Sequence, residues 1–140
     1  MTISFNYKTV KRPDWTEVRT PSIPIVLFGE ESFETVALLD SGADISAIPK
    51  DIAEILGLDL SSKHGTAYGI GGRTETIDTT MGILIEKGHE KYSFRIPVKV
   101  ILGAYDFPIL LGRDGFFDKF VISFNELQEK VSLKRFTGRN

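Results

Sequence analysis

The chain has 140 residues, of which 41% are hydrophobic and 26% charged, and its formal net charge is −2. These values are typical of one globular domain with a single hydrophobic core, and they exclude a disordered chain. Basic residues are spread from Lys8 to Arg139 without a dense block, so we expect no nucleic-acid partner. The absence of cysteine excludes disulfides, thiol catalysis and cysteine-bound zinc.

Residues 1–20 have the weakest pattern of the chain. Ile3, Phe5 and Tyr7 alternate with polar residues, as in a strand, but Lys11–Asp14 interrupts this alternation. We expect either an edge strand or an arm. No apolar run approaches the roughly 20 residues that span a bilayer, and no charged start precedes an apolar segment, so we expect a cytoplasmic protein without a membrane partner.

Two strands are expected over residues 22–28 and 33–39, joined by the polar turn Gly29–Ser32. The second strand ends in Ala37–Leu39, which is apolar on both faces, as in a strand buried on both sides. It leads directly into Asp40, which we therefore expect near the centre of the molecule, where water is scarce. A charged carboxylate in such a place needs hydrogen bonds or a functional reason.

A short helix is expected over Pro49–Leu56, with proline at its first position and Gly57 as its stop. Ile52, Ile55 and Leu56 have the spacing of one buried helical face. Further strands are expected over residues 74–86 and 92–102, with a tight turn between them.

The last third of the chain begins with the apolar run Pro108–Gly112, which we interpret as a core strand. Asp114 is expected to cap a short helix through Phe116–Phe120. Residues 121–125 and 130–136 alternate between apolar and polar, which predicts a C-terminal hairpin over residues 121–136.

Three segments could carry chemistry: Asp40–Asp44, Tyr68–Gly72 and Ile109–Asp114. Each also has an ordinary explanation. Asp-Ser-Gly is common in turns, because Asp and Ser bond to their own backbone and Gly accepts positive φ. The glycine-rich segment could be a plain hairpin turn, and the third could be a core strand that ends at a glycine.

Metal and cofactor sites are not expected. His64 and His89 are the only histidines, both stand beside glycine in polar segments, and without cysteine they offer no ligand set for zinc. Residues 40–45 also lack the glycine that a calcium loop requires at its sixth position, where Ile45 stands.

In their order and spacing, the three segments resemble the retropepsins, the single-domain aspartic proteases of retroviruses and of their cellular and microbial relatives. The resemblance covers roughly residues 23–120. It implies an all-β closed barrel with a flap hairpin and one or two short helices, in a single domain over residues 1–140. It also implies an aspartic endopeptidase that hydrolyses peptide or protein substrates.

The same resemblance implies roles for the first segment. Asp40 is the catalytic aspartate, the hydroxyl of Ser41 braces the paired loops across a dimer, and Gly42 gives the sharp turn. Ala43 and Asp44 bind the substrate backbone, as Gly42 does.

The resemblance also implies an ion pair between Asp44 and Arg113, which supports the active-site loop from behind. If this pair is partly buried, removal of one partner would cost roughly 3–5 kcal/mol. Gly69, Ile70 and Gly71 would form the tip of the flap, where Ile70 touches the substrate. The side-chain pockets would be lined by the apolar residues Ile48, Pro108 and Leu110, so apolar residues are expected around the cleaved bond.

The chain carries one Asp-Ser-Gly copy, whereas pepsin-like chains carry two. A homodimer would supply the second carboxyl, with Asp40 of each copy facing the other across a two-fold axis. Two alternatives stay open: a catalytically inactive dimeric domain of the same fold that binds peptide or protein, and an all-β structural module in which Asp40 is exposed and far from Gly71. The C-terminal hairpin is longer than the terminal strand of the viral enzymes, so the dimer interface is expected to be built differently or to be weaker.

Overall fold

The computed structural model describes residues 2–12, 14–61, 63–69, 72–103 and 108–135. Its strands are β1 (Thr2–Asn6), β2 (Lys8–Lys11), β3 (Glu17–Thr20), β4 (Ser22–Phe28), β5 (Ser32–Leu39), β6 (Ser46–Pro49), β7 (Lys63–Gly69), β8 (Gly72–Lys87), β9 (Glu90–Ile101), β10 (Ile109–Leu111), β11 (Phe120–Asn125) and β12 (Lys130–Arg135). The described ranges also contain one α-helix, α1 (Lys50–Leu56), and one 3₁₀ helix, η1 (Phe117–Lys119). The fold is therefore all-β, as predicted, and none of the described helices is long and apolar enough to cross a membrane.

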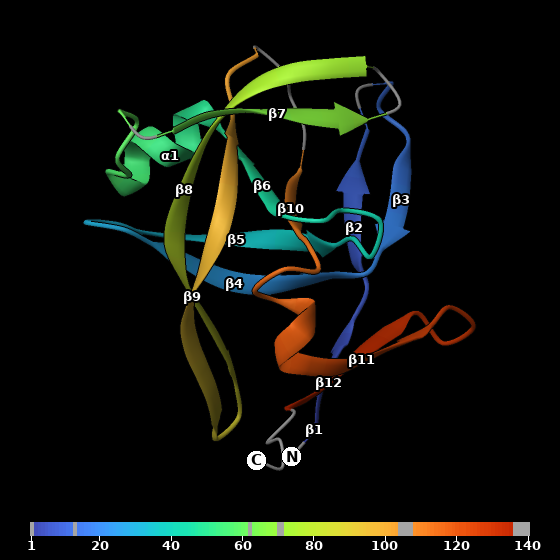
Figure 1. Ribbon diagram of the computed structural model, residues 1–140. Helices are drawn as coiled ribbons and strands as arrows, with labels where there is room; N and C mark the ends of the chain where they lie inside the picture. Colours follow the sequence, from blue (N-terminus) through green and yellow to red (C-terminus); the bar gives the residue numbers. More distant parts are fainter. Residues whose placement is uncertain (1, 13, 62, 70–71, 104–107, 136–140) are drawn as a thin grey trace.

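The largest sheet joins strands in the order β4, β5, β10, β6, β9, β8 and β7. β4 also pairs with β8, from Val26 opposite Leu84 to Phe28 opposite Gly82, so the sheet closes on itself. Figure 1 shows this ring in the middle of the molecule, with the β7–β8 hairpin arching above it. β8 belongs to both parts, because its first residues pair with β7 and its later residues pair with β4.

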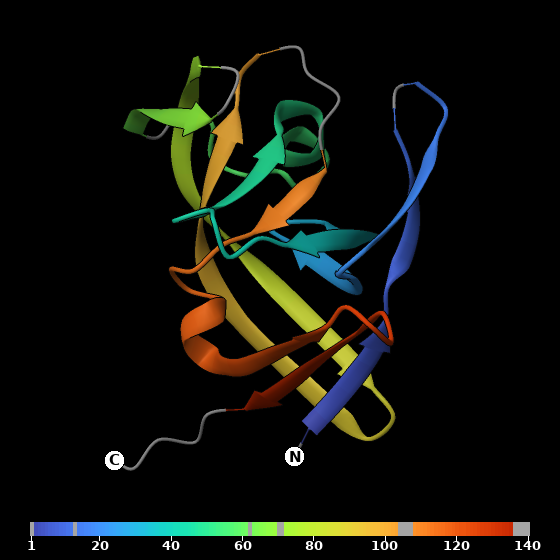
Figure 2. The ribbon, with the colours of Figure 1, turned by 90° about the vertical axis from the view of Figure 1, so that its right-hand side faces the viewer.

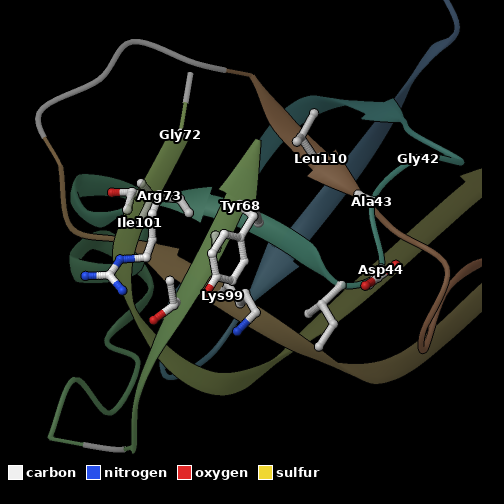
Figure 3. Close-up of a pocket in the computed structure, with 14 residues that line it drawn as sticks. Gly42, Ala43, Asp44, Tyr68, Gly72, Arg73, Lys99, Ile101 and Leu110 are labelled. Atoms are coloured by element: carbon white, nitrogen blue, oxygen red, sulfur yellow. The ribbon is translucent and has the colours of Figure 1, made fainter. Parts of the chain in front are cut away.

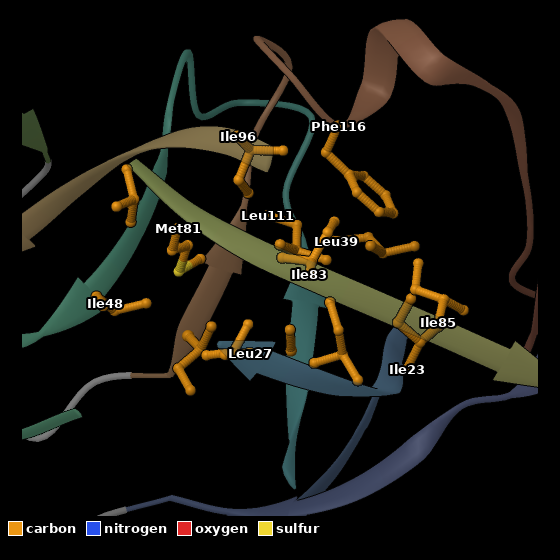
Figure 4. Close-up of a cluster of buried hydrophobic side chains, with 14 of the residues drawn as sticks. Ile23, Leu27, Leu39, Ile48, Met81, Ile83, Ile85, Ile96, Leu111 and Phe116 are labelled. Carbon is orange, nitrogen blue, oxygen red and sulfur yellow. The ribbon is translucent and has the colours of Figure 1, made fainter. Parts of the chain in front are cut away.

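The interior of the ring is filled with apolar side chains from the strands that form it and with Phe116, the residue before η1 (Figure 4). The largest of them are fully buried and include Ile23, Leu27, Ile48, Met81, Ile83, Ile85, Ile96, Leu111 and Phe116. Removing such a side chain from water stabilises the fold by roughly 1.5–3 kcal/mol. The ring is thus a packed scaffold, from which the connecting loops project.

The two ends of the described chain lie together in a second, three-stranded sheet with the order β1, β12, β11. Phe5 pairs with Val131, and the N–H of Tyr7 donates to the carbonyl of Glu129 over 2.8 Å. β2 and β3 follow as a separate two-stranded hairpin, which stands apart from the ring in Figure 2. The residues expected to be a strand or an arm therefore form a strand and then a hairpin.

Two details of the expected helices differ from the structure. Pro49 is the residue before α1, not its first residue, and Ile55 is exposed while Ala53 and Leu56 are buried. Asp114 does not cap a helix. Its backbone bridges to Ile45, and η1 is instead supported by the carboxylate of Asp118, which accepts the N–H of Gly115 over 3.1 Å.

Candidate active site

Asp40 begins the loop that connects β5 to β6. Its N–H donates to the carbonyl of Leu111 over 3.0 Å, which fixes the start of the loop to β10. Its carboxylate Oδ1 accepts the N–H of Gly42 over 2.9 Å, and its carbonyl accepts the N–H of Ala43 over 3.1 Å. The Asp-Ser-Gly sequence thus folds as a tight turn whose own backbone orients the carboxylate.

The expectation that Asp40 lies where water is scarce is wrong for the single chain. Asp40 is half-buried, and Ser41 and Gly42 are exposed. The cause is the position of the loop: the buried end of β5 stops at Leu39, and Asp40 is the first residue beyond it. The carboxylate is therefore open to solvent, or to a second molecule, on one side.

The loop is held from behind by the segment that follows β10. The N–H of Arg113 donates to the carbonyl of Ala43 over 2.9 Å, and the N–H of Asp114 donates to the carbonyl of Asp44 over 2.8 Å. Gly112 makes this approach possible, since a Cβ there would lie 2.7 Å from the carbonyl carbon of Ile45. The first and third motifs are therefore joined through their backbones.

Ser46 completes this connection and was missed in the sequence analysis. Its side chain is fully buried, and its Oγ accepts the N–H of Gly112 over 2.9 Å. A buried N–H without such a partner would be costly. A small polar residue before an apolar pair gives no signal in sequence, because its partner is far away along the chain.

The predicted ion pair between Asp44 and Arg113 is present. Its side chains are 81% and 58% exposed, respectively, so the condition of partial burial is not met in the single chain. An exposed pair of this kind contributes about 0–1 kcal/mol, not the 3–5 kcal/mol expected for a buried one. The backbone bonds on both sides of the pair do more than its charges to hold the loop.

A pocket of about 620 Å³ lies between this loop and the β7–β8 hairpin. Figure 3 shows Gly42, Ala43 and Asp44 on one side of it, and Tyr68 of β7 on another. Its lining residues are Gly42, Ala43, Asp44, Ile45, Ala47, Thr66, Ala67, Tyr68, Gly72, Arg73, Thr74, Lys99, Ile101 and Leu110. The structure thus brings together parts of all three motifs around one pocket. The volume of this pocket suits a peptide of several residues.

The other predicted pocket residues have different outcomes. Leu110 lines the pocket, but Ile48 is fully buried in the core, so the prediction for Ile48 is wrong. Neighbours on a strand face opposite sides, and Ala47 is the residue that faces the pocket. Pro108 is exposed and is not among the lining residues.

Of the three residues predicted at the tip of the flap, only Gly69 lies within the described residues. Gly69 pairs with Gly72 as the last described pair before the turn of the β7–β8 hairpin, whereas Ile70 and Gly71 lie outside the described residues. The predicted contact of Ile70 with substrate, like the predicted bond of Ser41 across a dimer, stays a prediction. Asp40 and Ser41 stand beside the pocket of the single chain without lining it.

One lining residue of a different kind, Lys99, was also missed. It lies on β9 and its Nζ is 3.1 Å from Oδ1 of Asp78 on β8. Burial raises the pKa of Asp78, but hydrogen bonds from Thr76 and Lys99 outweigh this effect, so the pKa lies below its usual value. Within the described ranges, no group of three or more His, Cys, Asp or Glu side chains is arranged to hold a metal ion.

Comparisons with known proteins concern the fold and the family of the chain. The chain is similar to a retropepsin-like aspartic protease from Rickettsia conorii, with 21% identity and a TM-score of 0.58 over 95% of this chain and 92% of that one. It is also similar to the EIAV protease solved with an inhibitor, with 25% identity and a TM-score of 0.47 over 71% of this chain and 86% of that one. No curated protein matches significantly. The family model described as aspartyl protease matches residues 24–114, which is more than half of the sequence, and the chain therefore belongs to the aspartyl protease family, with a retropepsin-like fold.

Proposed function

We propose that the protein is an aspartic endopeptidase whose active site forms between two identical copies, each of which supplies one Asp40. The observation that carries this proposal is the half-open position of Asp40: the turn fixes the carboxylate, yet leaves it exposed beside a pocket of peptide size. Amide hydrolysis by water needs both a base and an acid, and one carboxyl cannot serve as both at once.

The shape of the chain supports a partner at this position. In Figure 1, the loop between β5 and β6, the end of the β7–β8 hairpin where Gly69 pairs with Gly72, and the β2–β3 hairpin all extend toward the right-hand side of the ring. A copy related by a two-fold axis on this side would bring the two Asp40 loops face to face. Ser41 is exposed there, so its hydroxyl is free to bond across the axis.

The proposed chemistry follows from the repulsion of two close carboxylates. Two such groups cannot both be charged at low cost, so the pair holds one proton between them. The charged carboxylate takes a proton from a water molecule, which attacks the peptide carbonyl carbon. The protonated carboxyl donates to the carbonyl oxygen. As the tetrahedral intermediate breaks its C–N bond, the leaving nitrogen takes the proton that the first carboxylate received from water, and one hydroxyl of the intermediate returns a proton to the second carboxylate.

The lining of the pocket supports a preference for apolar residues near the cleaved bond. Leu110 and Ala47 lie on adjacent strands, opposite each other in the pairing of β10 with β6, and both line the pocket. Ile45 extends this apolar area toward the loop. Apolar side chains of a substrate would lose contact with water against these residues.

The test is cleavage of a peptide library by purified protein, with wild type and Asp40→Asn in parallel. Asn keeps the oxygen that accepts the N–H of Gly42 but cannot exchange the proton, so we expect a loss of at least about 1000-fold in cleavage with an unchanged melting temperature. Cleavage that survives in Asp40→Asn would contradict the proposal. Binding of pepstatin without any cleavage by the wild type would favour an inactive peptide-binding domain instead.

A further inference from the structure

The strand register places one row of side chains across the pocket side of the sheet. Leu110 on β10 is opposite Ala47 on β6, Ala47 is opposite Lys99 on β9, Lys99 is opposite Asp78 on β8, and Asp78 is opposite Lys63 on β7. Residues that face each other in a sheet point to the same side. The row is therefore apolar next to the Asp40 loop and charged toward the base of the β7–β8 hairpin.

The side chains at the charged end of the row are held in place by hydrogen bonds. The carboxylate of Asp78 accepts a hydrogen bond of 2.9 Å from Oγ1 of Thr76, which is fully buried, and one of 3.1 Å from Nζ of Lys99. Gly65 leaves the space for this carboxylate, because a Cβ there would lie 2.4 Å from Oδ2 of Asp78. Thr76 and Lys99 thus hold Asp78 in the space that Gly65 leaves, and Asp78 in turn holds Lys99 against the pocket.

The positive charges in this row exceed the negative ones. Lys99 and Lys63 flank the single carboxylate of Asp78, which interacts with both, so the row carries a surplus of one positive charge. Lys99 is 21% exposed, and it lines the pocket. A partly desolvated ammonium group that is already fixed in direction loses little further freedom when a second anion reaches it.

We infer that Lys99 is a specificity-determining residue that selects substrates with an acidic side chain, Glu or Asp, a few residues away from the cleaved bond. This inference rests on the proposed endopeptidase activity and names the substrate class of the same site. Neighbouring strands lie about 4.8 Å apart, so Lys99, two strands from Leu110, lies roughly 10 Å further along the pocket. An extended peptide covers that distance in about three residues, less the reach of the lysine side chain.

The proposed two-fold axis adds a second consequence. Each copy would contribute one Lys99, and the two would lie at equal distances from the Asp40 pair on opposite sides of the bound peptide. The preferred substrate is then a short apolar segment around the cleaved bond with an acidic residue on each side of it. One acidic residue should improve cleavage, and the second should improve it again by a similar factor.

The experiment uses a positional peptide library at about pH 6, where glutamate is ionised. For wild type, we expect kcat/KM to be about three- to fivefold higher for Glu than for Gln at one position on each side of the cleaved bond, with the difference shrinking in high salt. Lys99→Met should abolish this difference while still cleaving the Gln peptides. Lys91→Met, at the exposed far end of β9, is the matched control and should behave like wild type.

Asp78→Asn provides a second, opposite variant. It removes the competing carboxylate but keeps an oxygen near Thr76, so the preference for Glu should increase over wild type. Equal preference profiles for wild type and Lys99→Met, at every position, would overturn the inference while leaving the endopeptidase intact.

A binding measurement separates the two proposals. Asp40→Asn protein keeps the pocket, so its affinity for a Glu peptide and for the matched Gln peptide can be compared without cleavage. Tighter binding of the Glu peptide supports the role of Lys99 even if Asp40 proves not to be catalytic. Equal affinity for both peptides would overturn that role.

Discussion

The two walls of the pocket are built in different ways. One wall is formed by residues 42–45 of the loop that begins at Asp40, and we call it the Asp40 wall. Backbone hydrogen bonds join its loop to β10 and to residues 112–114, and it adjoins the buried side chains Leu39, Leu111 and Ser46. The other wall is formed by the β7–β8 hairpin, and we call it the β7–β8 wall. Its edge strand β7 pairs with β8 alone, and none of the described side chains of β7 is buried. The first wall therefore depends on the core, whereas the second depends on one strand pairing.

This difference fits what each wall is proposed to do. A carboxylate that moves a proton must be held within a fraction of an ångström of its working position. A strand that closes over a peptide must instead be able to adapt, and such elements are drawn from the less stable parts of a fold. Substitutions that disturb the backbone contacts of the Asp40 wall should accordingly have larger effects than substitutions in the β7–β8 wall, whereas the exposed ion pair of the Asp40 wall should contribute least.

Among substitutions that compare the stability of the two walls, the largest effect is expected for Gly112→Ala. Its Cβ would lie 2.7 Å from the carbonyl carbon of Ile45 and 2.9 Å from the carbonyl oxygen of Ala43, both backbone atoms of the Asp40 wall. The loop must move, so we expect a loss of about 1–3 kcal/mol in unfolding free energy and of at least about tenfold in cleavage. Urea unfolding and peptide cleavage measure the two.

The matched control for Gly112→Ala is Gly88→Ala in the turn between β8 and β9, where nothing lies within 4 Å of the added Cβ and φ is 62°. It should cost about 1 kcal/mol in stability and leave cleavage unchanged. If Gly112→Ala behaves like Gly88→Ala, the Asp40 wall is more adaptable than its contacts indicate.

A loss of stability in the same range, but without a backbone clash, is expected for Ser46→Ala. The substitution leaves the N–H of Gly112 buried without an acceptor, which should lower the unfolding free energy by about 1–3 kcal/mol. The exposed Ser123 offers a control, since Ser123→Ala should change stability by less than about 0.5 kcal/mol. Equal stability of the two variants would show that water or a shift of the backbone replaces the lost bond.

In the β7–β8 wall, Asp78 should make a modest, pH-dependent contribution. Because its pKa is lower in the folded chain than in the unfolded chain, the stability it adds is present above its unfolded pKa of about 3.9. That stability is lost as the pH falls through the lower folded value. Asp78→Asn should therefore be less stable than wild type at pH 7, and the two should converge toward pH 2. Urea midpoints that stay equally far apart over this range would contradict this account.

The smallest effect is expected for the ion pair between Asp44 and Arg113. Both side chains are more than half exposed, so a double-mutant cycle with Asp44→Asn and Arg113→Met should give a coupling of less than about 1 kcal/mol in unfolding free energy. A coupling of about 3 kcal/mol or more would mean that the pair is buried in solution, as it could be if a second copy covers it.

Local patterns in the sequence were enough to predict the strands over 22–28, 74–86 and 121–125, and the helix before Gly57. Each of these depends on alternation or helical spacing within one segment. The helix cap at Asp114 was wrong, because its backbone is taken by the bridge to Ile45, a tertiary contact that the local pattern does not contain.

For the candidate site, too, local sequence patterns predicted some residues and missed others. Asp40, Gly42 and Leu110 could be found from motifs, since their roles are tied to fixed neighbours in sequence. Ser46 and Lys99 could not, because Ser46 gains its role from Gly112, which is distant in sequence, and Lys99 gains its place at the pocket from the pairing of β9 with the distant strand β6. Ile48 was assigned to the pocket instead of Ala47, and one residue of register reverses which side chain faces the pocket.

The central claim is that two copies of Asp40 form one active site, and mixing tests it most directly. Wild-type and Asp40→Asn chains are combined in equal amounts at a fixed total concentration and left to exchange, and peptide cleavage is then measured. If both carboxylates are required, random pairing leaves about one quarter of the wild-type activity, because about one dimer in four has two wild-type chains. Half of the activity would instead mean that each chain works with its own Asp40, and would contradict the claim.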